Sequence, residues 1–211
     1  ADVGGELVVI AEGRTPWEVF TDVRFLGNSR VDPCSRVLKR EVLRKWLTEN
    51  TEPVHTTIYL GIGHDEAHRF ENAAKNHAPW AVRAPLCEDQ SIPLSINAAR
   101  AELAAAGIAL PRLYQLGFAH NNCGGFCVKA GQASFKKLLE QLPAVYASHE
   151  ASEEALRAHL GKDVSVMVDR RGGTKKPLTM RAFRERIQGG NALDLEEEND
   201  WGACACLSES S

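Results

Sequence analysis

The sequence lacks the features that direct a chain into or across a membrane. No apolar run approaches the roughly 20 residues that a membrane-spanning helix needs. The N-terminus has no basic region followed by a long apolar core, so it does not predict a signal peptide. The net charge of -3 provides no bulk attraction to nucleic acid or to an acidic membrane surface. We therefore expect a cytoplasmic protein with no membrane partner, and its charge does not indicate nucleic acid or a partner protein.

An initiator methionine and internal repeats are also missing. Because the chain starts close to a short apolar run at residues 6–10, we expect it to be a processed or truncated piece. Its 211 residues, with 44% hydrophobic and 25% charged side chains, are enough for one domain with a real core. We predict a single domain over residues 1–195 and a cysteine-bearing tail over residues 196–211.

Hydrophobic periodicity predicts strands that alternate with helices. Predicted strands lie at residues 6–10, 55–63, 80–86 and 163–169. Predicted helices lie at residues 35–50 with Ser35 as the cap, 93–107, 131–161 with a break near Pro143, and 177–190. Residues 14–33 contain several breakers and are predicted to be mostly loop. This order indicates an α/β fold with a mainly parallel sheet, in which ligands bind beyond the carboxyl ends of the strands.

Cysteine, by contrast, is well represented, and its spacing is the most informative feature of the chain. Cys123 and Cys127 are three residues apart with two glycines between them, so the backbone can fold to direct both sulfurs at one ion. In a reducing compartment, metal or catalytic roles are favoured over a disulfide. A closed zinc site or a four-iron cluster needs four ligands, so Cys34, Cys87 or the tail must supply the rest. A pair of buried structural thiols is the alternative.

The tail contains a second cysteine pair. Cys204 and Cys206 form C-x-C just after Trp201. This spacing suits metal ligation, or an accessible dithiol that attacks a substrate and then closes to a disulfide. Trp201 favours docking of the tail, and a tail whose cysteines have no function is the alternative.

Polar and basic residues follow several of the predicted strands and loops. In residues 61–69 (GIGHDEAHR), a helix that starts at Asp65 directs its amide groups toward an anion, and Glu66 and Arg69 can pair on one face. An ordinary capped helix start is the alternative. Further candidates for phosphate binding, with solvated faces as the alternative, are Arg36, Lys39, Arg40, Arg170 and Arg171.

Taken in order, these segments resemble the phosphoadenosine-phosphosulfate (PAPS) reductase family of the adenine-nucleotide α-hydrolase superfamily. The likeness is greatest to the small PAPS-reductase-like proteins common in actinobacteria and their phages. The matched segments are PCSRVLKREVL, GIGHDEAHR, APLCEDQSIPLS and the quite specific LYQLGFAHNNCGGFC. The resemblance implies the HUP-type fold of that superfamily, a mainly parallel sheet with flanking helices.

The chain departs from the family pattern in three places. The Ser-Gly-Gly-x-Asp-Ser phosphate loop and its N-terminal strand are missing. Cys34 is single where cluster-bearing reductases have an adjacent pair, and Gly63-His64 replaces the arginine of G-x-R. Sulfonucleotide reduction is therefore an expectation that the departures weaken.

The resemblance also implies roles for individual residues. Cys34, Cys123 and Cys127 occupy positions that bind a 4Fe-4S cluster in cluster-bearing relatives, and Cys87 is our choice for the fourth ligand. Zinc is the alternative metal. Cys204 and Cys206 take the part of the reductases' catalytic tail thiol, or are themselves ligands. The implied ligand is an adenine nucleotide or sulfonucleotide, and its predicted contacts are Arg36, Lys39, Glu66, Arg69, Arg170 and Arg171.

Three functions remain open. The leading one is a nucleotide-activating or sulfur-handling enzyme, similar to a sulfonucleotide reductase or an ATP pyrophosphatase, with a thiolate-bound metal centre. The missing phosphate loop favours a non-catalytic relative in which the metal is structural and the surface binds a partner, such as phage or host DNA-modification machinery. The third is a simple zinc-stabilised domain.

Overall fold

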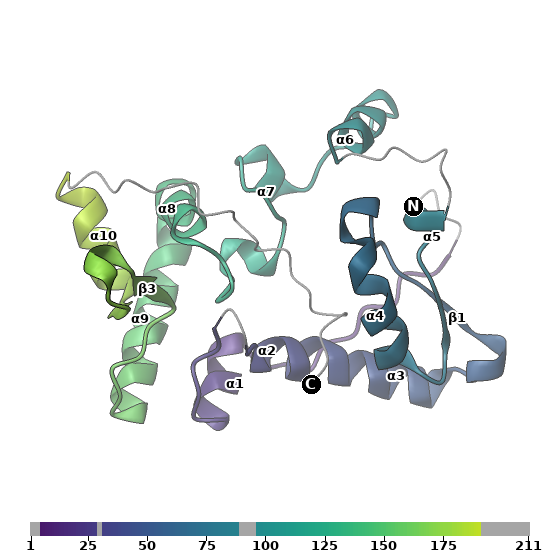
Figure 1. Cartoon of the computed structure of the whole chain (residues 1–211), viewed down its shortest axis with the longest axis horizontal. Helices are drawn as coiled ribbons and strands as arrows, with labels where there is room; N and C mark the ends of the chain where they lie inside the picture. Colours follow the sequence, from purple (N-terminus) through teal and green to yellow (C-terminus); the bar gives the residue numbers. More distant parts are fainter. Residues whose placement is uncertain (1–4, 29–30, 89–95, 191–211) are drawn as a thin grey trace. The chain divides into compact units, whose positions relative to one another are not determined.

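The computed structural model describes residues 5–28, 31–88 and 96–190 (Figure 1). The described residues fall into two compact units. Unit 1 holds residues 5–14, 35–88 and 96–101, and unit 2 holds residues 15–28, 31–34 and 102–190. The predicted single domain over residues 1–195 spans both units and stays a prediction, and the predicted tail over residues 196–211 lies outside the described residues. None of the helices in the described part of the chain combines the length and apolar character needed to cross a bilayer.

Unit 1 is built around a small parallel sheet. Strand β1 (Thr57–Tyr59) pairs with β2 (Ala81–Arg83), with Ile58 opposite Val82. The chain passes between them through the 3₁₀ helix η3 (His64–Arg69) and helix α4 (Phe70–His77). A small core lies beside the sheet, and its buried members are Leu60, Ile62, Ala73 and Ala84. Both central strand predictions are confirmed: β1 lies in a β-branched run that ends at Gly61, and β2 ends shortly before Pro85.

A long helical segment precedes this sheet. It begins as α2 (Pro33–Ser35), continues through the π-helical η1 (Arg36–Glu41) and ends as α3 (Val42–Asn50). The predicted cap at Ser35 is wrong, because Ser35 already has helical backbone angles and makes no capping bond. Proline at the first helical position loses no hydrogen bond, so the helix can begin at Pro33 instead. The remaining elements are η2 (Pro53–His55), α5 (Pro85–Glu88) and α6 (Ile96–Ala105).

The predicted buried strand at residues 6–10 is wrong. These residues form no strand, and the side chains of Leu7 and Val9 are 85% and 82% exposed. A run of apolar residues becomes buried only where another element covers it. In the described part of unit 1, no strand pairs with residues 6–10.

Unit 2 is mostly helical and carries an antiparallel strand pair. Its elements are α1 (Pro16–Asp22), α7 (Arg112–Gln115), η4 (Cys123–Gly125), α8 (Gln132–Gln141), α9 (Pro143–Leu160), β3 (Met167–Asp169), η5 (Arg171–Gly173), β4 (Lys176–Leu178) and α10 (Met180–Gln188). Figure 1 shows the long helix α9 beside α8 and α10, and α1 also packs on α9. The mixed α/β character is confirmed, but β3 and β4 are antiparallel and separate from the sheet of unit 1. The larger HUP-type sheet stays a prediction.

Helix α1 lies where a loop was predicted. The Thr15 hydroxyl accepts from the Glu18 backbone N–H at 3.3 Å, and the Glu18 carboxylate accepts from the Thr15 N–H at 2.6 Å. This capping box starts the helix, and Trp17 and Phe20 bury its apolar face. The breakers that predicted a loop therefore flank a short helix, with Pro16 at its first position.

A buried carboxylate joins three elements of unit 2. Glu153 on α9 is fully buried. Its two oxygens accept from the backbone N–H of Val166, just before β3, at 2.9 Å, and from that of Met180, at the start of α10, at 2.6 Å. Burial raises the pKa of this carboxyl, while the two backbone donors oppose the rise. Glu153 therefore accepts hydrogen bonds from two backbone N–H groups that would otherwise have no acceptor in the core.

We expect Glu153→Ala to lower the free energy of unfolding by about 3 kcal/mol, because it leaves two buried N–H groups without an acceptor. Glu153→Gln keeps one acceptor oxygen and should cost less. Urea denaturation followed by circular dichroism measures both. The neighbouring Glu154, which lies 3.8 Å from Arg181, is the matched control, and Glu154→Ala should cost at most about 1 kcal/mol. Equal losses for the two alanine variants would contradict this role of Glu153.

Candidate functional site

The loop that carries Cys123 and Cys127 has an unusual backbone. Cys123, Gly124 and Gly125 have φ angles of 48°, 65° and 93°, so three successive residues lie in the left-handed region. A Cβ at position 125 would lie 3.2 Å from the Leu138 side chain and 3.3 Å from the Phe118 ring. Glycine is thus required both for the turn and for its close approach to the core. The loop curls tightly, as the spacing of the two cysteines predicted.

Aromatic contacts hold this loop against helices α1 and α9 of unit 2. Phe126, between the two cysteines, is 2% exposed and stacks on the His149 ring with centroids 3.9 Å apart. The Trp17 indole N–H donates to Nδ1 of His149 at 2.8 Å, so that nitrogen carries no proton. Burial lowers the pKa of His149 to about 4, which keeps the ring neutral at physiological pH. Helices α1 and α9 thereby position the cysteine loop.

Three of the four predicted ligand cysteines, Cys34, Cys123 and Cys127, belong to unit 2. The Cys127 thiol is hydrogen-bonded to the Cys123 sulfur, and half-buried Cys34 packs at the edge of the same core. The bond to Cys123 raises the pKa of Cys127, and burial and the nearby Cys123 and Cys34 sulfurs raise it further. A backbone hydrogen bond from Lys129 acts in the opposite direction. Cys34 therefore acts electrostatically on the pair, and its role as a metal ligand stays a prediction.

An ion pair flanks the three thiols along the chain. The Lys129 ammonium lies 3.6 Å from the Asp32 carboxylate, and the two side chains are only 9% and 7% exposed. Asp32 is two residues before Cys34, and Lys129 is two residues after Cys127. The pair therefore places one charge of each sign on the segments that present the cysteines.

The donor chemistry of this group fits a thiophilic metal. Thiolates suit both zinc and iron–sulfur clusters, and a glycine turn with a backbone N–H directed at a sulfur is a favourable frame for either. Among the described residues, no group of three or more His, Cys, Asp or Glu side chains is arranged to hold an ion. With the raised pKa of Cys127, its thiol is protonated at neutral pH, so ligation would release a proton.

The other predicted cysteines lie elsewhere. Cys87 belongs to unit 1, where its thiol donates to the Ile62 carbonyl at 3.0 Å. Its role as the fourth ligand stays a prediction. Cys204 and Cys206, predicted as catalytic, lie outside the described residues.

At the carboxyl end of β1, the predicted pairing of Glu66 with Arg69 is confirmed by a hydrogen-bonded ion pair. The helix begins at His64 rather than Asp65, and its first six residues are 3₁₀. Nε2 of His64 is buried, and no described residue gives it a hydrogen-bond partner. A ligand at the carboxyl edge of this sheet would find His64 and Arg69 on the same short helix.

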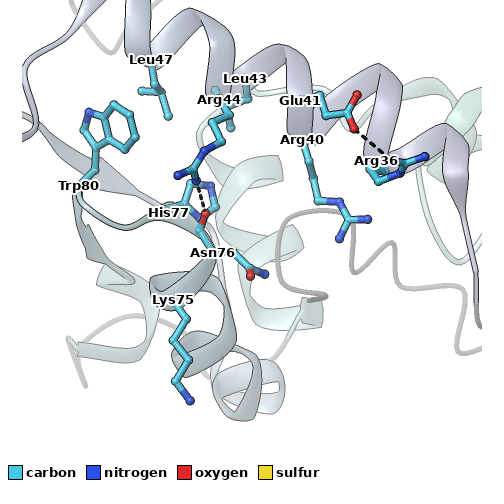
Figure 2. Close-up of a pocket in the computed structure, with 10 residues that line it drawn as sticks. All are labelled: Arg36, Arg40, Glu41, Leu43, Arg44, Leu47, Lys75, Asn76, His77 and Trp80. Carbon is cyan, nitrogen blue, oxygen red and sulfur yellow. Dashed lines mark hydrogen bonds and ion pairs between the residues drawn. The ribbon is translucent and has the colours of Figure 1, made fainter. Parts of the chain in front are cut away.

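The remaining predicted anion contacts are divided between the two units. In unit 1, Arg36 lines a pocket of about 490 Å³ and pairs with Glu41 at 3.4 Å, whereas Lys39 is exposed and is not part of the lining (Figure 2). In unit 2, Arg171 donates to Asp169 from Nε at 3.0 Å and from Nη2 at 2.8 Å, and this holds the pKa of Asp169 far below its usual range. Arg170 is exposed.

Nothing in the sequence indicated that several residues belong to the cysteine loop or to the pocket. His149 lies within a helix, and nothing in its neighbourhood predicts contact with Trp17 or Phe126, which are far away in the chain. In the pocket, Lys75, His77 and Trp80 join the arginines of a helix about 30 residues earlier. Only the four-residue spacing of Arg36, Arg40 and Arg44 could have been noticed.

Comparison with models of known protein families, with curated proteins and with solved structures finds no match. The family that the cysteine and glycine segments resemble therefore stays a prediction.

The neutral state of His149 predicts a pH dependence of stability. Because the pKa is about 4 in the folded chain and near 6.5 in the unfolded one, the unfolded chain binds more protons between these values. Stability should be complete above about pH 6.5 and fall toward pH 4 by at most about 3 kcal/mol. Urea denaturation across this range measures the slope. His149→Phe removes the titrating group and should flatten the slope, whereas His159→Gln, on an exposed position of α9, should leave it intact. An unchanged slope in His149→Phe would assign the pH dependence to other groups.

Proposed function

We propose that this chain is a PAPS-reductase-like protein that handles a nucleotide or an oxidised sulfur group and carries a thiolate-bound metal centre. The observation that carries the proposal is the hydrogen-bonded pair of Cys123 and Cys127, with Cys34 in the same unit and near enough to raise the pKa of Cys127. Cys34 is almost 90 residues before the pair in the sequence, and such a distant thiol has no local reason to lie there. A 4Fe-4S cluster is the first choice for the metal, and zinc is the second.

In this proposal, the three cysteines bind the metal, and Cys87 or a tail cysteine completes the set. A bound cluster supplies electron transfer or electrostatic stabilisation of substrate, and zinc supplies Lewis acidity. The Lys129 N–H donates to the Cys127 sulfur and so stabilises its thiolate. The Phe126–His149 stack packs the residue between the two cysteines against α9. Cys204 and Cys206 remain the proposed catalytic thiols.

The proposed nucleotide or sulfonucleotide binds at the carboxyl ends of β1 and β2. Ligands of parallel sheets bind at this edge, because the loops that follow the strands meet there. Arg69 offers a guanidinium for phosphate or sulfate, and Glu66 orients it through their ion pair. His64 contributes a buried ring nitrogen for which the described residues offer no partner. Lys39, Arg170 and Arg171 stay predicted contacts, although Arg170 and Arg171 belong to unit 2, whereas Arg36 lines a separate pocket of unit 1.

One observation favours the non-catalytic alternative. Arg69 and Arg171, two of the proposed phosphate contacts, already pair with Glu66 and Asp169. An arginine that is already paired with a carboxylate must give up part of that interaction to bind a phosphate. The net free energy of phosphate binding is therefore smaller. In this second proposal the metal only stabilises unit 2, and the chain acts by binding a partner. Saturable micromolar binding of an adenine nucleotide that depends on Arg69 would count against it.

Anaerobic reconstitution with iron and sulfide tests the metal centre. We expect the broad visible absorption of an iron–sulfur cluster, or, if the metal is zinc, stoichiometric zinc in a colourless protein. Cys123→Ser and Cys127→Ser each remove a metal ligand. Loss of a residue that only supports a ligand already weakens metal binding about tenfold, so each variant should weaken it at least that much. Ser134→Ala, on the neighbouring helix α8, is the control and should bind metal as the wild type does.

Cys87→Ser then decides the fourth ligand. Loss of metal equal to that in Cys123→Ser assigns Cys87 to the centre, and full retention removes it. A protein that is colourless and zinc-free after anaerobic purification and reconstitution would overturn the proposed centre altogether.

A further inference from the structure

The pocket of unit 1 lies between the helical segment η1–α3 and the end of α4 (Figure 2). Its volume of about 490 Å³ falls within the range of small-molecule sites, roughly 300 to 1,000 Å³. Asn76, His77 and Trp80 in its wall precede β2, so the pocket is beside the amino end of that strand. It is therefore separate from the carboxyl edge, where the proposed nucleotide site lies.

The lining is strongly basic in an acidic chain. Its cations are Arg36, Arg40, Arg44 and Lys75, and its single carboxylate is that of Glu41. Four positive charges and one negative charge leave the lining at +3, whereas the whole chain has a net charge of -3. A concave surface of one sign concentrates the field and attracts small ions of the opposite sign. The pocket is thus built for an anion.

The three arginines are spaced four residues apart on one helical segment. Figure 2 shows Arg40 and Arg44 leaving the helix on the same side, toward α4. Over the eight residues from Arg36 to Arg44 the helix rises by about 10 to 12 Å, which exceeds the size of one phosphate. The first part of the segment is π-helical. This conformation is rare in proteins overall, and where it occurs it is often part of a functional site. A ligand that uses this row needs more than one anionic group.

Hydrogen bonds tie the opposite wall to the arginine helix, and two buried side chains add apolar surface. Arg44 donates to the backbone carbonyls of Asn76 at 2.9 Å and Ala78 at 3.1 Å, which fixes the α4–β2 connection to α3. The Trp80 indole N–H donates to the Thr51 hydroxyl at 2.9 Å, so the ring is held in place. Trp80 and Leu47 are 7% and 6% exposed and present apolar surface to the pocket. Fixed walls reduce the entropy that the protein must lose when a ligand binds.

We infer that this pocket binds a small organic anion that carries at least two phosphate or sulfate groups on a planar or apolar body. Arg36, Arg40 and Lys75 hold the anionic groups, because guanidinium and ammonium groups form charge-assisted bonds with such oxygens. Arg44 keeps the two walls together, and Trp80 and Leu47 contact the body. The inference is independent of the metal centre and of the carboxyl-edge site.

Isothermal titration of the full chain with three probes tests this inference. The probes are ATP without a divalent cation, inorganic pyrophosphate and adenosine, at low ionic strength, where charge attraction is least screened. ATP should bind saturably, pyrophosphate about tenfold more weakly because it lacks the body, and adenosine should not bind detectably. Arg40→Gln and Lys75→Gln should each weaken ATP binding about tenfold. These two variants leave the Arg44 bonds intact, and circular dichroism checks that they fold.

Two control variants separate this pocket from other sources of anion binding. Lys45→Gln removes an exposed cation of α3 that is outside the pocket, so a loss as large as in Arg40→Gln would mean general charge attraction and overturn the inference. Arg69→Gln removes the cation of the carboxyl edge. Loss of ATP binding in Arg69→Gln but not in Arg40→Gln would assign the nucleotide to the proposed functional site and overturn the pocket. Equal affinities for ATP and pyrophosphate would overturn the role of Trp80 and Leu47.

Discussion

The stack of Phe126 on His149 is the contact on which the thiol group of unit 2 depends. It joins a three-residue left-handed turn, which has little regular structure of its own, to the longest helix of the unit. The hydrogen bond from the Trp17 N–H needs a neutral imidazole, because the unprotonated Nδ1 of His149 is its acceptor. Burial of the ring ensures that state. The position of Cys123 and Cys127 is therefore set by an aromatic cluster, and the cysteines themselves contribute little to it.

Charge plays different roles in the two units. In unit 2, charged groups are turned inward and support the fold, as Glu153 does by accepting two backbone N–H groups and as Asp32 and Lys129 do by pairing in near-complete burial. In unit 1, cations gather on a pocket wall with only one carboxylate among them. A net charge of -3 hides this separation, because it averages over both units. Local charge distribution is therefore more informative about ligands than the total.

Local patterns predicted most elements well. The strands at β1 and β2, the break at Pro143 and the glycine that ends α10 were all found from short-range signals, since each depends on a few adjacent residues. The errors have the same origin. Residues 6–10 have the composition of a buried strand but no partner, and Pro16 and the residues around it read as breakers although Thr15 and Glu18 form a capping box. A pattern records what a segment prefers, and packing decides whether that preference is met.

The sequence by itself determined the donor chemistry and the tight turn between Cys123 and Cys127, because two glycines within a C-x3-C spacing permit few other backbones. It also indicated, through resemblance, that Cys34 belongs with them. Only the tertiary structure decided that His149 and Trp17 support this turn, and that Lys75 and Trp80 line one pocket with arginines from an earlier helix. The physical reason is that these contacts join residues from about 20 to more than 130 positions apart. Such pairs leave no periodic trace in a single sequence, since each partner lies in an otherwise ordinary helix or loop.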